Sequence, residues 1–330
     1  MISTDARKDI IMFNDYIKPL KYNNISQTKK LRKLGTLAIG VVETTPIVWQ
    51  DRLLRFEWIR SSSWGKRHNS QRELGYYHFV DMETEEEVGK PFAFGNAFGC
   101  AYEENGVMYV HGVGGNGAPE GCNYIDVYYS TDLCEWKTQR AITLPEHLHI
   151  FNTSVCKDAD GYIMAIEVDG PPEIIGERFT VLFARSKDLL DWTLMPIDKY
   201  IFYKERYSAC PSIRYFDGMY YIVYLEGLPF YRWTPYIVRS RDLIEFEVAL
   251  LNPFMLFGDE DRQVIHPERF TAEELDSIKT SPNGNNSDVD FCEYHGKTYI
   301  TYSWGNQLGN EFLALAEYDG SLEDFLRSYF

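Results

Sequence analysis

Three glutamates stand where apolar runs begin or end in this 330-residue chain. Glu43 opens the run TTPIVW, Glu167 closes MAIE and Glu226 closes VYLE. Two carboxyl groups that face one cavity can cleave a glycosidic bond, because one protonates the leaving oxygen while the other activates water or attacks the anomeric carbon. Glu43, Glu226 and Glu167 are therefore the candidate catalytic acids. Hydroxyl and amide groups around Glu43 predict an ionised carboxylate, and the apolar neighbours of Glu226 predict a protonated acid.

These positions also have structural interpretations. Glu43 could bind backbone amides at a strand start, and Glu167, with Asp169 two residues on, could form a strand-end ion pair. His111 is a reserve acid or base, because histidine titrates near neutral pH. A single histidine at a strand end more often serves packing.

Further polar residues could bind a sugar. Asp288 and Asp290 alternate with Val289, so a regular strand would place both carboxylates on one face. There they could hold hydroxyl groups, act in catalysis or coordinate a calcium ion, or they could simply cap turns. Trp304 and Asn306 offer a ring for stacking and an amide for hydroxyl groups, or form a plain turn with a packed ring.

Three more residues complete the candidate binding set. Arg206, between Glu205 and Tyr207, would suit an anionic sugar through a bidentate pair, or would pair with an acid of its own chain. Asn96 and Asn152 stand at predicted strand starts. The sequence has no metal-ligand spacing, so no cofactor is expected apart from the possible calcium ion.

The elements that must position these residues repeat about every 55 residues. One phrase, Ser-x-Asp-Leu-x-x-aromatic, begins at Ser130, Ser186 and Ser240. An apolar run, a two-residue turn and an aromatic run precede each phrase and predict a β-hairpin. The turns favour the positive φ angles that tight hairpins need, at Asn105-Gly106, Asp160-Gly161 and Asp217-Gly218. Weaker copies lie at 44 to 60 and 289 to 305.

Five copies of this unit predict an all-β fold, a five-bladed β-propeller, because one blade needs four strands and a period of about 40 to 55 residues. We expect residues 1–36 to form a lead packed on the propeller and 37–330 to form the blades. An insertion at about 250–286 carries the capping box of Thr271 and Glu274, which predicts a short helix over 271–279, within a flap over one face. Two β-sandwich domains would also give evenly spaced turns, but they would not repeat the phrase.

Over residues 37–330 the repeated phrase resembles the five-bladed propeller glycoside hydrolases of families 43, 32, 62 and 117. It differs from the sialidase box, because leucine follows the Asp directly and no glycine comes after it. The resemblance implies an axial funnel with site residues at the starts of the inner strands. Counting back from the turns, these starts are Glu43, Asn96, Asn152, Ala209 and Asp288.

The resemblance also implies a base at the first blade, an Asp that adjusts pKa at the third and a Glu acid at the fourth. Glu43 fits the first position, whereas Asn152 and Ala209 stand at the other two. Glu226 or Glu167 would then replace the missing acid. The alternative is a non-catalytic carbohydrate-binding propeller. A phosphorylase would need a cationic pocket that the sparse basic residues do not supply.

Composition excludes other classes of function. Forty-nine Asp and Glu against 33 Lys and Arg give a net charge of −16, which makes nucleic acid an unexpected partner. The first 25 residues carry charges throughout and no run of 18 apolar residues occurs, so we expect no signal peptide, no membrane partner and a cytoplasmic location. The six cysteines lie far apart and are expected as free thiols.

Taken together, these features predict an exo-acting glycosidase for a terminal sugar of a plant or algal polysaccharide fragment. An oligosaccharide is the expected partner.

Overall fold

Four-stranded antiparallel units make up most of this computed structural model, which describes residues 31–61, 74–115, 122–229, 232–306 and 311–330. Unit 1 contains β2 (Thr44–Trp49), β3 (Arg52–Ile59), β4 (Tyr76–Asp81) and β5 (Glu87–Phe92). Unit 2 contains β6 (Ala97–Glu104), β7 (Val107–Val113), β8 (Tyr124–Ser130) and β9 (Lys137–Thr143). Unit 3 contains β10 (His149–Asp158), β11 (Gly161–Asp169), β12 (Thr180–Ser186) and β13 (Trp192–Leu194).

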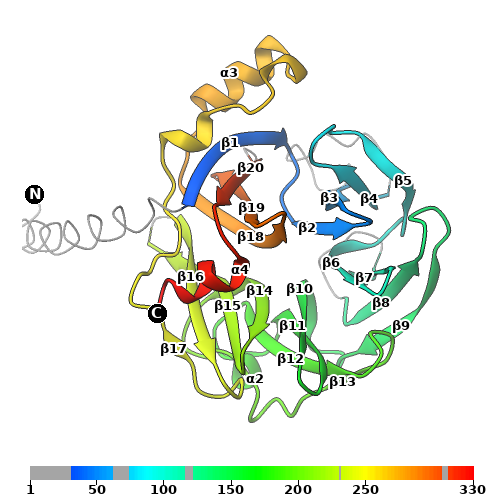
Figure 1. The fold of residues 1–330 in the computed structure, drawn as a ribbon. Helices are drawn as coiled ribbons and strands as arrows, with labels where there is room; N and C mark the ends of the chain where they lie inside the picture. Colours follow the sequence, from blue (N-terminus) through cyan, green and yellow to red (C-terminus); the bar gives the residue numbers. More distant parts are fainter. Residues whose placement is uncertain (1–30, 62–73, 116–121, 230–231, 307–310) are drawn as a thin grey trace, which may run out of the picture.

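The remaining strands form units 4 and 5. Unit 4 contains β14 (Ser208–Phe216), β15 (Met219–Leu228), β16 (Arg232–Ser240) and β17 (Glu247–Val248). Unit 5 contains β18 (Asn285–Tyr294), β19 (Lys297–Gly305), β20 (Glu311–Tyr318) and β1 (Leu31–Ile39). A parallel pair between Trp233 and Asn285 joins these two units into one eight-stranded sheet. Figure 1 shows the units arranged as a ring.

Helices are few and short among the described residues. They are α2 (Pro172–Ile175), α3 (Ala272–Thr280) and α4 (Leu322–Arg327), with 3₁₀ turns η2 (Asp259–Arg262) and η3 (Pro267–Arg269). None of them is long and apolar enough to cross a membrane. The predicted helix is confirmed as α3, and Thr271 and Glu274 form its capping box. The insertion was expected to form a flap over one face, but its helix α3 lies outside the ring, beyond β1 (Figure 1).

The repeated phrase and two of the three predicted hairpin turns have the expected local geometry. Asn105 and Gly106 both have positive φ, at 53° and 79°, and so do Asp217 and Gly218, at 48° and 77°. In the turn at Asp160-Gly161 only Gly161 has a positive φ, at 138°. In the phrase, Ser186 Oγ accepts from the Leu189 amide at 3.0 Å, and Asp188 Oδ1 accepts from the amides of the two residues after Leu189. Leu189 is buried at a φ of 68°. The same bonds recur at the other two copies, so the phrase is a self-capped turn that ends the third strand.

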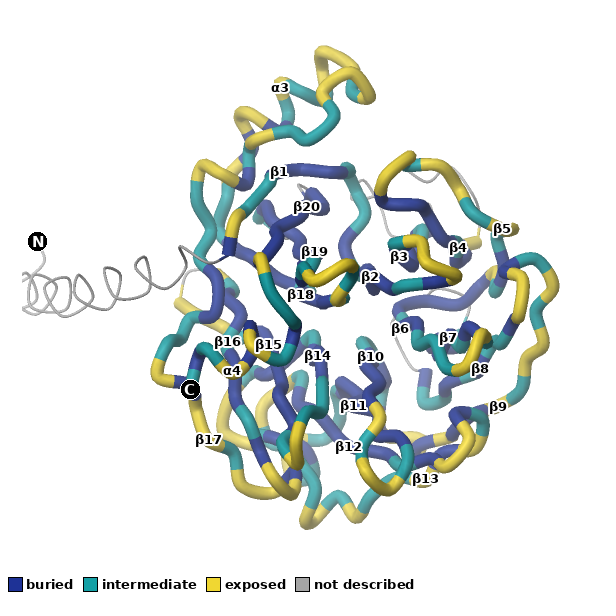
Figure 2. Tube along the Cα trace, in the orientation of Figure 1, coloured by how far each residue is buried: buried dark blue, intermediate teal, exposed yellow. Residues whose placement is uncertain are grey.

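The apolar core lies within and between neighbouring units. Buried residues follow the strands and exposed residues gather in the turns (Figure 2). The largest fully buried side chains include Trp58, Tyr77, Phe183, Tyr224 and Trp304. Each such side chain contributes roughly 1.5–3 kcal/mol by leaving water, so the interlocked units form a stiff frame. All six cysteines are free thiols, as predicted.

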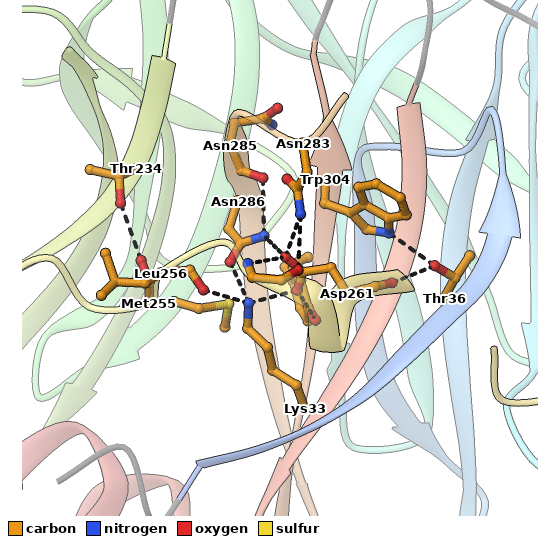
Figure 3. A network of polar contacts seen from close by, with 12 residues as sticks. Lys33, Thr36, Thr234, Met255, Leu256, Asp261, Asn283, Asn285, Asn286 and Trp304 are labelled. Carbon is orange, nitrogen blue, oxygen red and sulfur yellow. Dashed lines mark hydrogen bonds and ion pairs between the residues drawn. The ribbon is translucent and has the colours of Figure 1, made fainter. Parts of the chain in front are cut away.

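A buried polar cluster ties the insertion to the closing strands (Figure 3). Lys33 of β1 donates to Asp261 Oδ1 at 2.6 Å, to Asn286 Oδ1 at 2.7 Å and to the carbonyl of Leu256 at 2.6 Å. Asp261 is fully buried and also accepts from the Tyr302 hydroxyl at 2.9 Å. Every proton of the ammonium group therefore has an acceptor.

The predicted boundary at residue 36 falls inside a strand. Residues 1–30 of the predicted lead lie outside the described residues. Leu31–Ile39 is β1, which pairs antiparallel with β20 and forms an edge strand of unit 5. The described part of the lead thus belongs to the sheet.

Candidate functional site

A small pocket lies where the inner strands of all five units begin. Its lining comes from unit 1 (Glu43, Thr44, Thr45), unit 2 (Gly99), unit 3 (Asn152, Thr153), unit 4 (Cys210, Pro211, Ser212) and unit 5 (Asp288, Val289, Asp290). The pocket holds about 30 Å³ of open space. That volume admits one or two water molecules and is too small for a sugar ring. A sugar would have to rest above it.

β-Bulges position the side chains around this pocket. In unit 5 the pairing passes from Ser287–Ser303 to Asp290–Thr301, so Asp288 and Val289 face a single partner residue. Units 2, 3 and 4 have the same bulge at the same point. Asp288 takes a φ of 51° and Cys210 a φ of 49°, values that non-glycine residues rarely adopt. A bulge re-aims the side chains beside it, and bulges of this kind often lie next to active sites.

The strand register corrects which residues are equivalent between units. By strand register Asp288 corresponds to Cys210 in unit 4, not to Ala209, and Asn152 corresponds to Pro211. Glu226 pairs opposite Ser208 and Asp169 opposite His149, so Glu226 is the equivalent of Asp169. Glu226 therefore does not occupy the place of Glu167 one unit on.

Asp288 is a half-buried carboxylate held by hydroxyl groups. Its Oδ2 accepts from Ser287 Oγ at 2.6 Å and from Ser303 Oγ at 2.8 Å. The thiol of Cys210 also forms a hydrogen bond with Asp288. These three donors fix one carboxylate at the edge of the pocket, with no cation bound to it in the described residues.

Glu43 faces the pocket in an ion-pair cluster. Arg60, which follows β3, donates from Nη2 to both Glu43 oxygens at 2.9 and 2.7 Å, and from Nη1 to Glu311 at 3.0 Å. Burial raises the pKa of Glu43 to about 7; Arg60 opposes this shift, and Asp288 and Glu311 add to it. The prediction that hydroxyl and amide donors lower the pKa of Glu43 is wrong. The cause is that the carboxyl group has lost water and has acidic neighbours.

Glu167 of β11 is a buried carboxyl group behind the pocket. Its Oε2 accepts from Asn152 Nδ2 at 2.9 Å and from the Cys210 amide at 2.8 Å. Burial raises the pKa of Glu167 to about 7, Asp288 adds to the shift, and these two donors oppose it. The carboxyl group is thus close to half protonated at neutral pH, as a general acid requires.

The third predicted acid lies in a separate group of side chains. Glu226 accepts from Arg206 Nη1 at 3.3 Å and from the Tyr224 hydroxyl at 3.2 Å. Burial raises the pKa of Glu226, in the predicted direction, and Arg206 opposes the shift. No contact in the described part of the chain joins Glu226 to Glu43. Arg206 is engaged by this acid, which is the internal pair that the sequence left open.

The predicted binding residues are scattered. Trp304 is fully buried, stacks on Phe312 and donates from Nε1 to Thr36, so its ring cannot receive a sugar. Its register partner on β18 is Asn286, so Trp304 is the equivalent of Glu226 in unit 4 and of Asp169 in unit 3. Asn306 follows β19 and is half-buried.

Asp290 and Asn96 are predicted sugar-binding residues, but both are bound by other side chains of the protein. The bulge separates Asp288 from Asp290, which binds Arg214 at 2.5 Å and Ser212 at 2.7 Å, so regular alternation is wrong here. Asn96 is buried and accepts from the Tyr128 hydroxyl at 3.2 Å. In the described residues no group of three or more His, Cys, Asp or Glu side chains could hold a metal ion.

His111 serves packing. It is fully buried against Trp192, whose Nε1 donates to it at 3.1 Å, and burial lowers its pKa to about 4. Arg60, Cys210 and Tyr207 are site residues that sequence reasoning did not select. Burial raises the pKa of Tyr207, with further contributions from Cys210, Glu167 and Asp288, so its phenol lies near the acids. The bulge at Cys210 left no signal in the sequence.

Solved structures with the same fold act on glycosides. No protein-family model matches the sequence, and a search of curated proteins finds no match. A structure described as a glycoside hydrolase has a TM-score of 0.60 at 13% identity, over 90% of this chain and 94% of that one. A thermostable family-43 glycoside hydrolase has a TM-score of 0.55 at 12% identity, covering 86% and 90% of the two chains.

A third structure belongs to glycoside hydrolase family 130. It has a TM-score of 0.55 at 13% identity, covering 86% of this chain and 85% of the other. Its description refers to mannoside phosphorylases and to glycoside hydrolases that target β-1,2-mannosidic linkages in Candida mannan. These likenesses confirm the predicted resemblance at the level of the fold: the chain is built like the propeller glycoside hydrolases.

Proposed function

We propose that the protein is a glycoside hydrolase on a five-bladed β-propeller, in which units 1 to 5 are the blades. Each unit has four strands, and the parallel pair between units 4 and 5 is a contact between two blades. β1 would close the ring by completing the last blade. The neighbours in the structure comparison support this interpretation.

One observation carries the functional proposal. Glu43 and Asp288 line one axial pocket, and Glu167 lies behind it, bound to the lining residues Asn152 and Cys210. Burial raises the pKa of Glu43 and of Glu167 to about 7. Glycoside hydrolysis needs one protonated and one ionised carboxyl group at the same bond. A site with unequal carboxyl environments meets this need.

The hydrogen bonds that each carboxyl group accepts suggest how the catalytic roles divide among them. Both bonds to Glu167 end on Oε2, so Oε1 can carry the proton that goes to the leaving oxygen. Asp288, held by two serine hydroxyls, would activate water or attack the anomeric carbon. Arg60 donates to both carboxyl oxygens of Glu43. Glu43 would bind a hydroxyl group of the sugar or keep the charge of the site negative. This replaces the pairing of Glu43 with Glu226.

We keep the terminal sugar as the proposed point of attack. The pocket itself, at about 30 Å³, is too small to hold a sugar, so terminal attack rests on the axial funnel that the sequence resemblance implies. The plant or algal origin of the fragment remains a proposal that rests on the sequence resemblance.

The proposal is tested with a panel of aryl glycosides and of arabinan, mannan, pectic and agar oligosaccharides. We expect release from at least one, and a loss of about 10²-fold or more in kcat in Glu167→Gln and in Asp288→Asn. Glu226→Gln is the matched control, because Glu226 also accepts two hydrogen bonds, but its donors Arg206 and Tyr224 do not line the pocket, whereas the donors to Glu167 do. Equal loss in the control would contradict the assignment.

A carbohydrate-binding propeller is the second candidate. The observation that favours it is Ala209 at a position where the resembled families carry an acid. The two functions separate in one experiment: saccharide binding without release from any substrate in the panel would identify a binding module.

A further inference from the structure

Aromatic rings form a continuous arc across units 1 to 4. Ring centroids lie 4.8 Å apart for Trp58 and Phe98, 5.5 Å for Phe98 and Phe151, 4.9 Å for Phe151 and Phe179, and 5.5 Å for Phe179 and Tyr207. Trp58 and Phe98 are buried. The last three rings are only half-buried, so part of each reaches the surface.

The arc adjoins the axial pocket. Phe98 and Phe151 lie within the bulges, and each is followed in the chain by a residue that lines the pocket, Gly99 and Asn152. Tyr207 precedes β14, and its phenol is influenced by Glu167 and Asp288. The half-exposed rings therefore border the place where a sugar must rest, above a pocket too small to contain it.

Phe179 is held in an unusual conformation. Its φ is 59°, in the left-handed region that bulky residues rarely adopt. Arg178 covers one side of the ring, with its guanidinium carbon 5.1 Å from the ring centroid. Strained residues persist where the surrounding structure over-determines them, and they cluster at ligand sites.

The negative charge next to the arc favours uncharged sugars over anionic ones. Five carboxyl groups lie in or behind the pocket, and the arginines near them are bound to carboxylates: the acids are Glu43, Glu167, Asp288, Asp290 and Glu311, and the arginines are Arg60 and Arg214. Arg178, at the ring of Phe179, is likewise paired with Asp169. A uronate or phosphate group would meet excess negative charge there. Uncharged sugars have no such penalty, and their C–H faces pack on aromatic rings.

We propose that Phe179, against which Phe151 and Tyr207 pack edge to face at interplanar angles of 81° and 70°, offers its ring as the stacking surface for an uncharged sugar ring bound above the axial pocket. The identity of the ligand rests on the proposed function. Binding itself does not require turnover, so the two proposals can fail separately.

The test is calorimetric titration with mannobiose, galactobiose, arabinobiose and digalacturonate. We expect one or more neutral disaccharides to bind, and digalacturonate to bind at least tenfold more weakly. Phe179→Gly removes the ring at a φ that glycine accepts, and should weaken binding roughly three- to tenfold. Phe179→Tyr should stay within about twofold. Tyr129→Ala, which removes a half-buried ring at the other end of unit 2, is the control.

Three results would overturn the inference. They are binding of no neutral disaccharide, wild-type affinity in Phe179→Gly with an unchanged melting temperature, and binding of digalacturonate as tight as that of the neutral sugars. If the neutral disaccharide binds as expected but is never cleaved, the stacking surface stands and the hydrolase proposal fails.

Discussion

Glu167 should make the protein less stable as pH rises, although it is a carboxyl group in an acidic site. It is buried, and its pKa is raised from the ordinary 4.5 to about 7. Between these values the folded chain binds more protons than the unfolded chain, so the free energy of unfolding falls as pH rises. At about 1.4 kcal/mol per pH unit, the full effect is about 3 kcal/mol.

Glu167→Gln removes this titration and retains an oxygen that can accept from Asn152 and from the Cys210 amide. Relative to that of wild type, the free energy of unfolding of the variant should rise by up to about 3 kcal/mol as the pH goes from 5 to 8. Urea unfolding followed by tryptophan fluorescence at both pH values measures this gain. Glu226→Gln removes a less buried carboxyl group, so its free energy of unfolding relative to wild type should change less between the two pH values. A stability difference between Glu167→Gln and wild type that is the same at both pH values would refute the reasoning.

Three further changes should alter stability. Lys33→Met leaves the fully buried Asp261 without its cation and should cost about 3–5 kcal/mol in urea unfolding, part of which Asp261→Leu in the same chain recovers. Ser186→Ala removes the hydroxyl that caps the Leu189 amide and should lower stability by about 1 kcal/mol, with no effect on saccharide affinity. Gly112→Ala places a methyl group 2.5 Å from the Tyr77 hydroxyl and should cost about 1–3 kcal/mol; a melting temperature equal to wild type would contradict this packing.

Local features of the fold could be predicted because their causes are local. The turn at Asn105-Gly106 needs only two residues with positive φ, and the phrase at Ser186 caps itself within five residues. The capping box of α3 spans Thr271 to Glu274. Repetition of such short signals was enough to indicate an all-β fold of four-stranded units.

The site was harder to predict, because an error of one residue in the register changes which side chain lies at the pocket. Counting back from each turn made Ala209 the equivalent of Asp288, whereas the strand register gives Cys210. The bulge also separates Asp288 from Asp290, which a regular strand would place on one face. Partners distant in sequence left no signal either. Arg60 joins Glu43 of unit 1 to Glu311 of β20, a contact that exists only once the ring has closed.

Closure by β1 also sets an order of events during synthesis. β1 is made before every other described strand, and its partner β20 is the last strand to be made, so this pairing is the most non-local in the molecule. Until β20 emerges, β1 has an open hydrogen-bonding edge that could pair with another chain. Moving β1 behind β20 by circular permutation would turn ring closure into a local hairpin, and the refolding rate should rise.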